Sequence, residues 1–134
     1  MTSLSEHNKM KKVKRTERGW AAHLCVANQC RFKRNTLLEY GKKKIVVSTI
    51  GKWYPRGQET AEQIGCDSYF ETMAFKAIYE KPYWEADVTK QISFDSDCEL
   101  NECEHDSDLK ANDIHEKVVN EITTKLESGE KFTC

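Results

Sequence analysis

The feature that most constrains this chain is the run Ile-Val-Val-Ser-Thr-Ile at residues 45–50, which is β-branched almost throughout and therefore typical of a strand. Residues 35–40 precede it, and Gly41-Lys42-Lys43 separate the two stretches. Gly41 can supply the positive φ that a short hairpin loop requires. Residues 35–40 and 44–50 therefore predict a β-hairpin, and the rest of the chain is interpreted around it.

A second hairpin is predicted from residues 69–79 and 83–94, which flank the turn Glu80-Lys81-Pro82. The later run alternates apolar and polar side chains, as a half-buried strand does. The earlier run is also compatible with a helix, but its close connection to a strand favours a strand. Residues 20–26 predict a first strand, and residues 51–65 predict a loop with one possible helical turn at 59–63.

The C-terminal region predicts a helix with one apolar stripe. Asp106 or Ser107 can cap its start, Lys125 complements the dipole at its end, and Gly129 lies where a C′ glycine belongs. The predicted fold is α+β, an antiparallel sheet of four or five strands built from two hairpins and covered by one C-terminal helix. The stripe consists of Ile114, Val118, Val119, Ile122 and Leu126.

At 134 residues the chain has the size of one domain. We expect residues 1–18, which lack a hydrophobic period, to form a flexible basic arm, and residues 19–134 to form a single α+β domain. No apolar run approaches the roughly 20 residues that cross a bilayer, so no membrane partner is expected. No apolar block follows the charged N-terminal residues, which predicts a cytoplasmic location.

Charge is unevenly distributed along the chain, although the formal net charge is −1. Residues 1–67 hold fourteen Lys and Arg against six Asp and Glu, whereas residues 68–134 hold seven against sixteen. The two halves either neutralise each other within the fold or face two different partners, and the sequence leaves both alternatives open.

The basic residues include a group in which an aromatic side chain lies among cations. Such a group suits phosphate contact combined with base stacking. It also suits a hairpin edge whose lysines prevent pairing between sheets, and this second interpretation is favoured. The candidate nucleic-acid-binding residues are Arg31, Phe32, Lys33, Arg34, Lys42, Lys43 and Lys44.

Residues 95–108 contain seven carboxylates and no Lys or Arg. Their spacing does not match a calcium-binding loop, which requires a fixed ligand order and a central glycine. They form either a solvated loop or a nucleic-acid mimic that docks on a basic surface by electrostatic complementarity. The candidate partner-binding residues, which we call the acidic belt, are Asp95, Asp97, Glu99, Glu102, Glu104, Asp106 and Asp108.

Histidine and cysteine recur in two groups, whose spacing lies within the loose limits of a zinc site if the groups meet. A mid-strand cysteine suits burial better than a metal-binding turn, so no cofactor is expected. Zinc is the one alternative that the sequence leaves open. His23 beside Cys25 could also serve as base and nucleophile, whereas His115 on the helix is expected to be solvated. The candidate metal ligands are His23, Cys25, Cys30, Cys98, Cys103 and His105.

Four segments of the sequence resemble a group of small proteins carried by phages and other mobile elements. They are GWAAHLCVANQCRFKRNTLLEYGKKKIVVSTIG, IGCDSYFETMAF, YWEADV and ANDIHEKVV. The likeness covers residues 19–122 and lends no activity or catalytic residue. It implies a context in which short, charge-polarised proteins block host defences, including CRISPR complexes, by stoichiometric binding.

We therefore expect a non-enzymatic binding protein that inhibits a host nucleic-acid-handling defence complex through a charged surface, as an anti-CRISPR protein does. Its partner would be a protein or ribonucleoprotein complex in the cytoplasm of a bacterial host. One alternative is a nucleic-acid-binding module that uses the basic arm and residues 31–34. The other alternative is a zinc- or thiol-dependent enzyme using His23, Cys25 and Cys30.

Overall fold

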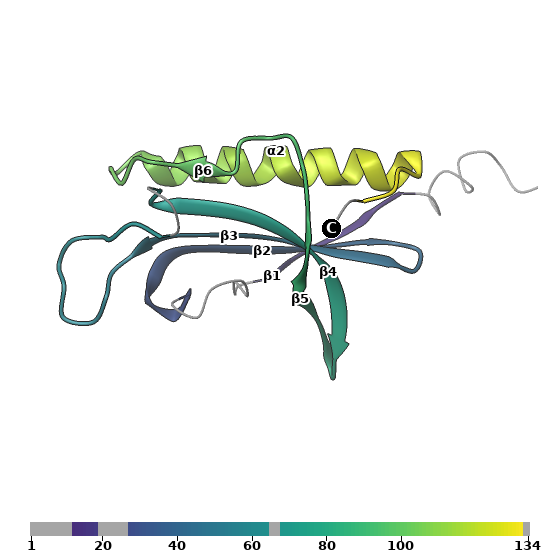
Figure 1. Ribbon diagram of the computed structural model, residues 1–134, viewed down its shortest axis with the longest axis horizontal. Helices are drawn as coiled ribbons and strands as arrows, with labels where there is room; N and C mark the ends of the chain where they lie inside the picture. The colour runs from purple at the N-terminus through teal and green to yellow at the C-terminus, as the bar shows by residue number, and fades with distance from the viewer. Residues whose placement is uncertain (1–11, 19–26, 65–67, 133–134) are drawn as a thin grey trace, which may run out of the picture.

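The structure is a computed structural model that describes residues 12–18, 27–64 and 68–132. One antiparallel sheet has the strand order β1-β2-β3-β4-β5, with the short β6 paired to β4, and α2 lies across one face of it (Figure 1). The predicted α+β fold is confirmed. The elements are β1 (Lys14–Arg18), η1 (Ala27–Gln29), β2 (Cys30–Tyr40), β3 (Lys43–Trp53), β4 (Phe70–Glu80), β5 (Tyr83–Ile92), β6 (Glu99–Leu100) and α2 (Ser107–Ser128).

The predicted hairpin at residues 35–50 is the centre of the sheet. Its strands pair from Cys30 opposite Trp53 to Tyr40 opposite Lys43, so only Gly41 and Lys42 form the loop. Gly41 has φ +60°, and it is the first of the two loop residues, as in a type II′ turn. The strands are longer than predicted because pairing on both sides supports polar residues that lack strand propensity on their own.

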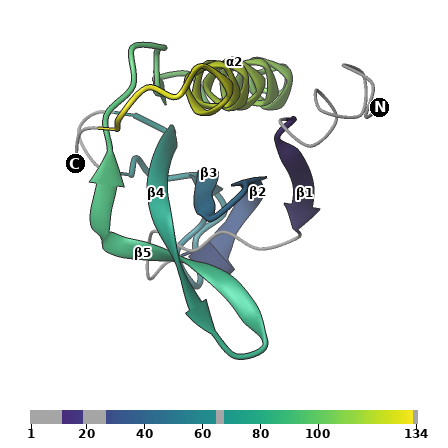
Figure 2. The same cartoon turned by 90° about the vertical axis from the view of Figure 1, so that its right-hand side faces the viewer.

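The second hairpin, β4–β5, is also confirmed, and residues 69–79 are strand rather than helix. Its register is interrupted between Phe75 and Ala77, where four residues of β5 lie opposite Lys76. Bulges of this kind bend a sheet. The tip of the hairpin accordingly turns away from α2 and projects from the opposite side of the sheet (Figure 2).

The main core lies between α2 and the sheet. It includes four of the five stripe residues, whereas Ile114 is only half-buried. The facing sheet residues include Leu38, Ile45 and Val47. A smaller cluster of Cys30, Ile50 and Ile64 lies toward the other end of the hairpin, with Trp53 against it.

Gly51 on β3 lies where there is no room for a side chain. A Cβ there would meet the Phe70 ring and lie 2.7 Å from the Tyr69 carbonyl oxygen. Phe70 is opposite Gly51 in the register and fully buried. The close approach of the Phe70 ring therefore explains why glycine interrupts an otherwise β-branched strand.

Several sequence-based expectations are wrong or only partly met. The last five residues of the predicted arm form β1, because they pair with the exposed edge of β2. Residues 59–63 contain no helical turn, and Glu62 instead bridges to Trp53. The acidic belt contributes the short strand β6, whose two residues are exposed and half-buried. The first predicted strand, residues 20–26, and residues 1–11 lie outside the described residues.

The ends of α2 follow the prediction in position but not fully in chemistry. Asp106 occupies the N-cap, but its side chain forms no capping hydrogen bond. Gly129 has φ +79°, and its N–H bonds to the Leu126 carbonyl, as expected of a C′ glycine. The chain then returns toward the sheet, where Phe132 contacts the core. No helix in residues 12–18, 27–64 and 68–132 is long and apolar enough to span a membrane.

Candidate functional site

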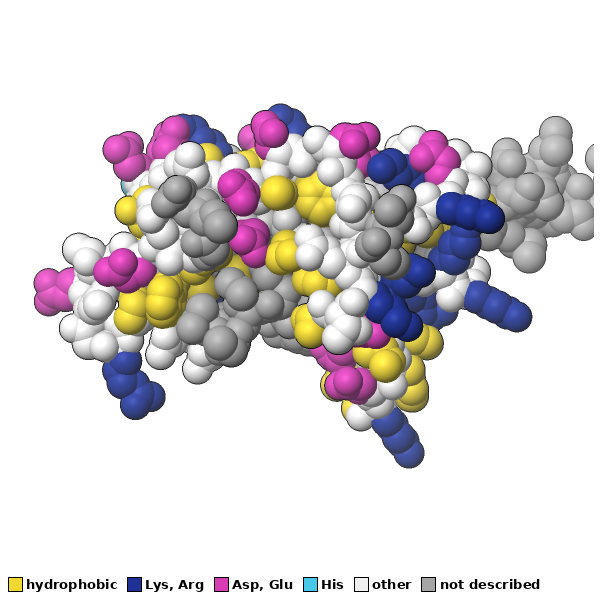
Figure 3. Space-filling view, viewed as in Figure 1, with side chains coloured by type: hydrophobic (Ala, Val, Ile, Leu, Met, Phe, Trp, Pro, Cys, Tyr) yellow, Lys and Arg dark blue, Asp and Glu magenta, His cyan; other side chains and the backbone are white. Residues whose placement is uncertain are grey.

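A hollow of about 450 Å³ lies at the end of the sheet where β2 turns into β3. Its walls come from that turn, from β4 and β5, and from the residues after α2. Lys and Arg side chains gather at this end of the molecule (Figure 3). We call it the lysine hollow, and it is lined by Lys42, Lys43, Lys44, Ile45, Lys76, Ala77, Trp84, Lys131 and Phe132.

Strand register and helix capping bring these distant residues together. The two-residue loop places Lys42 and Lys43 at the tip of the central hairpin. Lys76 is opposite Ile45 in the β3–β4 pairing, so it lies one strand away from the same tip. The left-handed Gly129 ends α2 and turns the chain so that Lys131 reaches this site.

The cations of the hollow are largely uncompensated. No Asp or Glu lines it. Among the described residues, Lys44 is the lysine of the hollow that has nearby polar partners: its Nζ donates to the Gly41 carbonyl at 3.2 Å and lies 3.9 Å from a Glu39 carboxylate oxygen. The other four lysines form no ion pair with any residue in the described part of the chain. Several like charges around one concave surface focus a positive potential that attracts anions.

Aromatic side chains form one wall of the hollow. Trp84 is half-buried, and the Lys44 Nζ lies 4.9 Å from the centre of its ring, within the range of a cation–π contact. Tyr79 is opposite Trp84 in the register, its ring centre is 5.3 Å away, and 52% of it is exposed. The hollow thus combines ammonium groups with the partly exposed Trp84 ring, and the more exposed Tyr79 ring lies beside Trp84, outside the lining.

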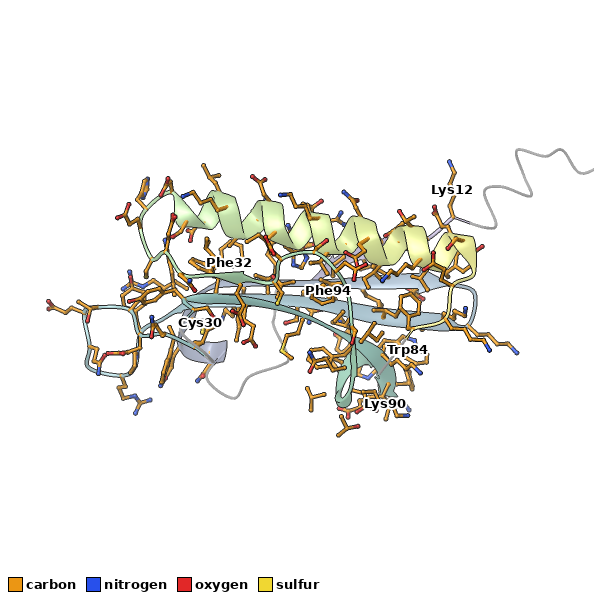
Figure 4. The ribbon with its side chains drawn as sticks, turned by 45° about the horizontal axis from the view of Figure 1, so that its top comes forward. Lys12, Cys30, Phe32, Trp84, Lys90 and Phe94 are labelled. Atoms are coloured by element: carbon orange, nitrogen blue, oxygen red, sulfur yellow. The ribbon has the colours of Figure 1, made fainter. Side chains whose placement is uncertain are left out.

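The predicted basic group is divided between the two ends of β2. Residues 31–34 lie near its start, about 30 Å from Lys42 along the strand. Figure 4 shows Phe32 and Trp84 toward opposite ends of the sheet. Arg31 lies over the Tyr54 ring at 3.7 Å, and the Phe32 ring contacts Phe70 edge-on at 5.5 Å.

Arg34 is committed to contacts within the protein. Its Nε donates to Glu17 at 2.8 Å, and Nη1 donates to Glu116 at 2.9 Å and to Asn112 at 2.7 Å. Arg15 also donates two hydrogen bonds to Glu116. The bond from Arg15, opposed by burial and reinforced by Arg34, lowers the pKa of Glu116 to about 2. These charges hold β1, β2 and α2 together.

The acidic belt is partly neutralised by the protein's own lysines. Lys110 pairs with Glu102 and lies 3.9 Å from Asp106, and Lys52 pairs with Asp108 at 2.8 Å. The remaining four carboxylates are exposed and form no ion pair with a described residue. These four, which we call the open carboxylates, are Asp95, Asp97, Glu99 and Glu104.

The described cysteines do not form a metal site. Cys30 is buried against Trp53, whereas Cys98 and Cys103 are half-buried and His105 is exposed. Burial raises the pKa of all three thiols, which favours the protonated form. Within the described ranges, no group of three His, Cys, Asp or Glu side chains could hold a metal ion. His23 and Cys25 lie outside those ranges.

His115 is the residue that the sequence interpretation misplaced, because it is fully buried and not solvated. Its Nε2 lies 2.7 Å from Thr36 Oγ1, and its Nδ1 lies 2.7 Å from Thr49 Oγ1. Thr36 also lies 2.6 Å from a Glu17 carboxylate oxygen, and Thr49 lies 2.7 Å from Thr72. These contacts form one continuous chain beneath α2.

The direction of the chain follows from its end at a carboxylate. Glu17 only accepts, so the Thr36 hydroxyl donates to it and accepts from His115 Nε2–H. Nδ1 then accepts from Thr49, which accepts from Thr72. Burial, with a further contribution from Arg34, lowers the pKa of His115 to about 4. A neutral histidine with both nitrogens occupied stabilises the fold and is not placed to act as a general base.

Comparison of the chain with protein-family models, with curated proteins and with solved structures finds no match. The candidate site therefore depends on the geometry and charge described above.

Proposed function

We propose that the protein is a non-enzymatic nucleic-acid-binding module that uses the lysine hollow. The observation that carries the proposal is a concave surface with five lysines and no acidic lining residue. Four of these lysines form no ion pair in the described part of the chain. Phosphate contacts made by such lysines supply most of the affinity of sequence-independent nucleic-acid binding.

The internal use of arginine supports the choice of this end over residues 31–34. Arg34 is already bound to two carboxylates, and Arg31 lies against Tyr54. If Arg34 bound a phosphate instead, Glu17 and Glu116 would lose their hydrogen bonds from its guanidinium group. Lys42 and Lys43 are exposed on a hairpin tip and can reach an anion without breaking any described contact.

A salt-dependent titration tests the proposal. Labelled nucleic acid is titrated with protein at about 50 mM and about 200 mM salt, and fluorescence anisotropy is measured. We expect binding at low salt that weakens steeply with salt. The double variant Lys42→Glu and Lys43→Glu should lose about tenfold or more in affinity. The matched control, Lys33→Glu with Arg56→Glu, changes the net charge equally at the other end of the sheet and should bind much better. Absence of binding at low salt would contradict the proposal.

A second candidate function is inhibition of a host nucleic-acid-handling defence complex by docking of the acidic surface. The specific observation in its favour is the set of open carboxylates, which are exposed beside β6 and α2. The resemblance to phage and mobile-element proteins supports the same context. Closely placed carboxylates can occupy a basic channel in place of a phosphate backbone.

Charge reversal at Asp97, Glu99 and Glu104 tests this second candidate without disturbing an ion pair described here. Purified CRISPR effector complexes are assayed for cleavage of target DNA with added protein. We expect the natural protein to inhibit cleavage and the triple variant to lose this inhibition. The thermal unfolding of the two proteins should be the same. Equal inhibition by the triple variant would eliminate the open carboxylates as the contact surface.

A further inference from the structure

Next to the lysines, the β4–β5 hairpin presents two aromatic rings on one face, which phosphate binding alone does not require. Tyr79 and Trp84 are directly opposite each other on β4 and β5, so both side chains lie on the same face of the hairpin. That face contributes Ala77 and Trp84 to the hollow, and Tyr79, opposite Trp84, extends the aromatic surface across the hairpin beyond the lining residues. The bend after Phe75 directs the hairpin tip away from α2 (Figure 2).

The Tyr79 ring is largely open to solvent. Its 52% exposure leaves a ring face or edge accessible next to Trp84, which lines the hollow. Lys44 already contacts Trp84 at 4.9 Å, which shows that this ring faces the lysine side of the hairpin. The Trp84 ring and the ammonium groups are therefore adjacent within one hollow of about 450 Å³, and Tyr79 continues the aromatic surface at its margin. That volume falls within the range of about 300–1,000 Å³ that is usual for small-ligand sites.

We propose that the lysine hollow is selective for single-stranded nucleic acid and takes an unpaired base stacked on Tyr79 and Trp84. Phosphates on either side of that base contact Lys42, Lys43 and Lys76. This inference rests on the proposed function and specifies its ligand. Charge complementarity favours nucleic acid over an uncharged or basic partner, and the aromatic pair favours it over an acidic peptide, which has no base to stack.

The two kinds of contact discriminate differently between nucleic-acid forms. Phosphates are present in both single strands and duplexes, so lysine contacts alone bind either form. The faces of bases inside a duplex are covered by neighbouring bases, so only an unpaired base can stack on a protein ring. Loss of one stacking ring typically reduces the affinity for a single strand by about fivefold to about 150-fold.

The experiment compares single strands with a duplex for variants of the exposed ring. The natural sequence, Tyr79→Leu and Tyr79→Phe are titrated against labelled DNA and RNA single strands of about twelve nucleotides and against a DNA duplex of that length. Tyr83→Leu is the matched control, since Tyr83 is 56% exposed on the opposite face of the same hairpin. An oligoglutamate of similar charge serves as the competing acidic peptide.

We expect the natural sequence to bind single strands more tightly than the duplex. Tyr79→Leu should reduce the single-strand affinity about tenfold and leave the duplex affinity unchanged, while Tyr79→Phe and Tyr83→Leu remain close to the natural protein. A difference between the DNA and RNA strands would identify which of the two is preferred.

Equal affinity for single strand and duplex, or equal losses in Tyr79→Leu and Tyr83→Leu, would overturn base stacking and leave phosphate binding at the lysines intact. Competition by oligoglutamate as effective as that by the single strand would likewise overturn it. No binding to any of the nucleic acids at low salt would overturn the proposed function as well.

Discussion

Beneath the first half of α2, polar and charged side chains contact one another, whereas beneath its second half the interface is apolar and the charges lie outside it. The first region holds His115 between Thr36 and Thr49. The second holds Val119 and Leu126 over the central hairpin, with the lysine hollow beyond its tip. Charge that the fold uses internally is therefore separated from charge that is available to a partner.

This separation explains why the number of basic residues in a segment is a poor guide to its role. Arg15 and Arg34 each carry one positive charge, as a lysine does, yet they bond to Glu116 in the folded protein. The planar guanidinium donates to two acceptors at once, which suits such internal contacts. Lysine on a hairpin tip keeps its ammonium group in water. The following predictions test whether stability and binding are divided between the two regions in this way.

Loss of the His115 side chain should have the largest effect on stability. His115→Ala removes the centre of the buried hydrogen-bond chain, leaves Thr36 and Thr49 with unmatched groups and creates a cavity. We expect the free energy of unfolding to fall by about 3 kcal/mol, measured by urea denaturation. Lys42→Ala at the other end should change it by less than about 0.5 kcal/mol. Equal effects of the two substitutions would contradict the comparison.

Acid should weaken the polar region through the same histidine. The pKa of His115 falls from 6.5 to about 4 on folding, so between these values the unfolded chain binds a proton that the folded protein does not. Stability therefore decreases as the pH falls through this window, by about 2 kcal/mol between pH 7 and pH 5. Unfolding of His115→Gln, measured over the same range, should lack this dependence. An identical slope in both proteins would exclude His115 as its source.

Arg34→Ala should have a smaller effect, because its partners are partly exposed to solvent. We expect the free energy of unfolding to fall by about 1 kcal/mol, after allowance for solvent screening. Its neighbour Lys33→Ala serves as the matched control and should change stability by less than about 0.5 kcal/mol. Neither variant should alter nucleic-acid affinity by more than about twofold. A tenfold loss of affinity in Arg34→Ala would return residues 31–34 to the binding surface.

The smallest effect is expected for the surface ion pairs of the acidic belt. Lys110→Ala removes the partner of Glu102, but both side chains are about half exposed. The free energy of unfolding should change by less than the error of its measurement, and high salt should reduce any difference further. A clear loss of stability in thermal or urea unfolding would mean that the belt contributes to the fold rather than to the surface.

Local periodicity was enough to predict the hairpin at residues 35–50 and the helix stripe, because each depends on neighbours in sequence. It did not predict β1, since Lys14–Arg18 has no strand propensity of its own and is held by the edge of β2. His115 was missed because its residue type suggests solvent. Its spacing, four after Ala111 and four before Val119, places it on the buried face of the helix.

The lysine hollow could be predicted only in part. The turn lysines were apparent as a basic cluster, but their aromatic wall comes from β4 and β5 and Lys131 comes from the chain after Gly129. These residues meet through strand register and a helix C-cap, which no local pattern specifies. The same cause made residues 31–34 and 42–44 seem to be one group, although β2 separates them.

The salt dependence of single-strand binding tests the central claim most directly. The logarithm of the association constant is measured against the logarithm of salt concentration for the natural sequence, for Lys42→Glu with Lys43→Glu, and for Lys33→Glu with Arg56→Glu. Each phosphate contact contributes about 0.7 to the slope for a single strand. We predict that the hollow variant loses about 1.4 from the slope while the control keeps it. An unchanged slope in the hollow variant would contradict the account.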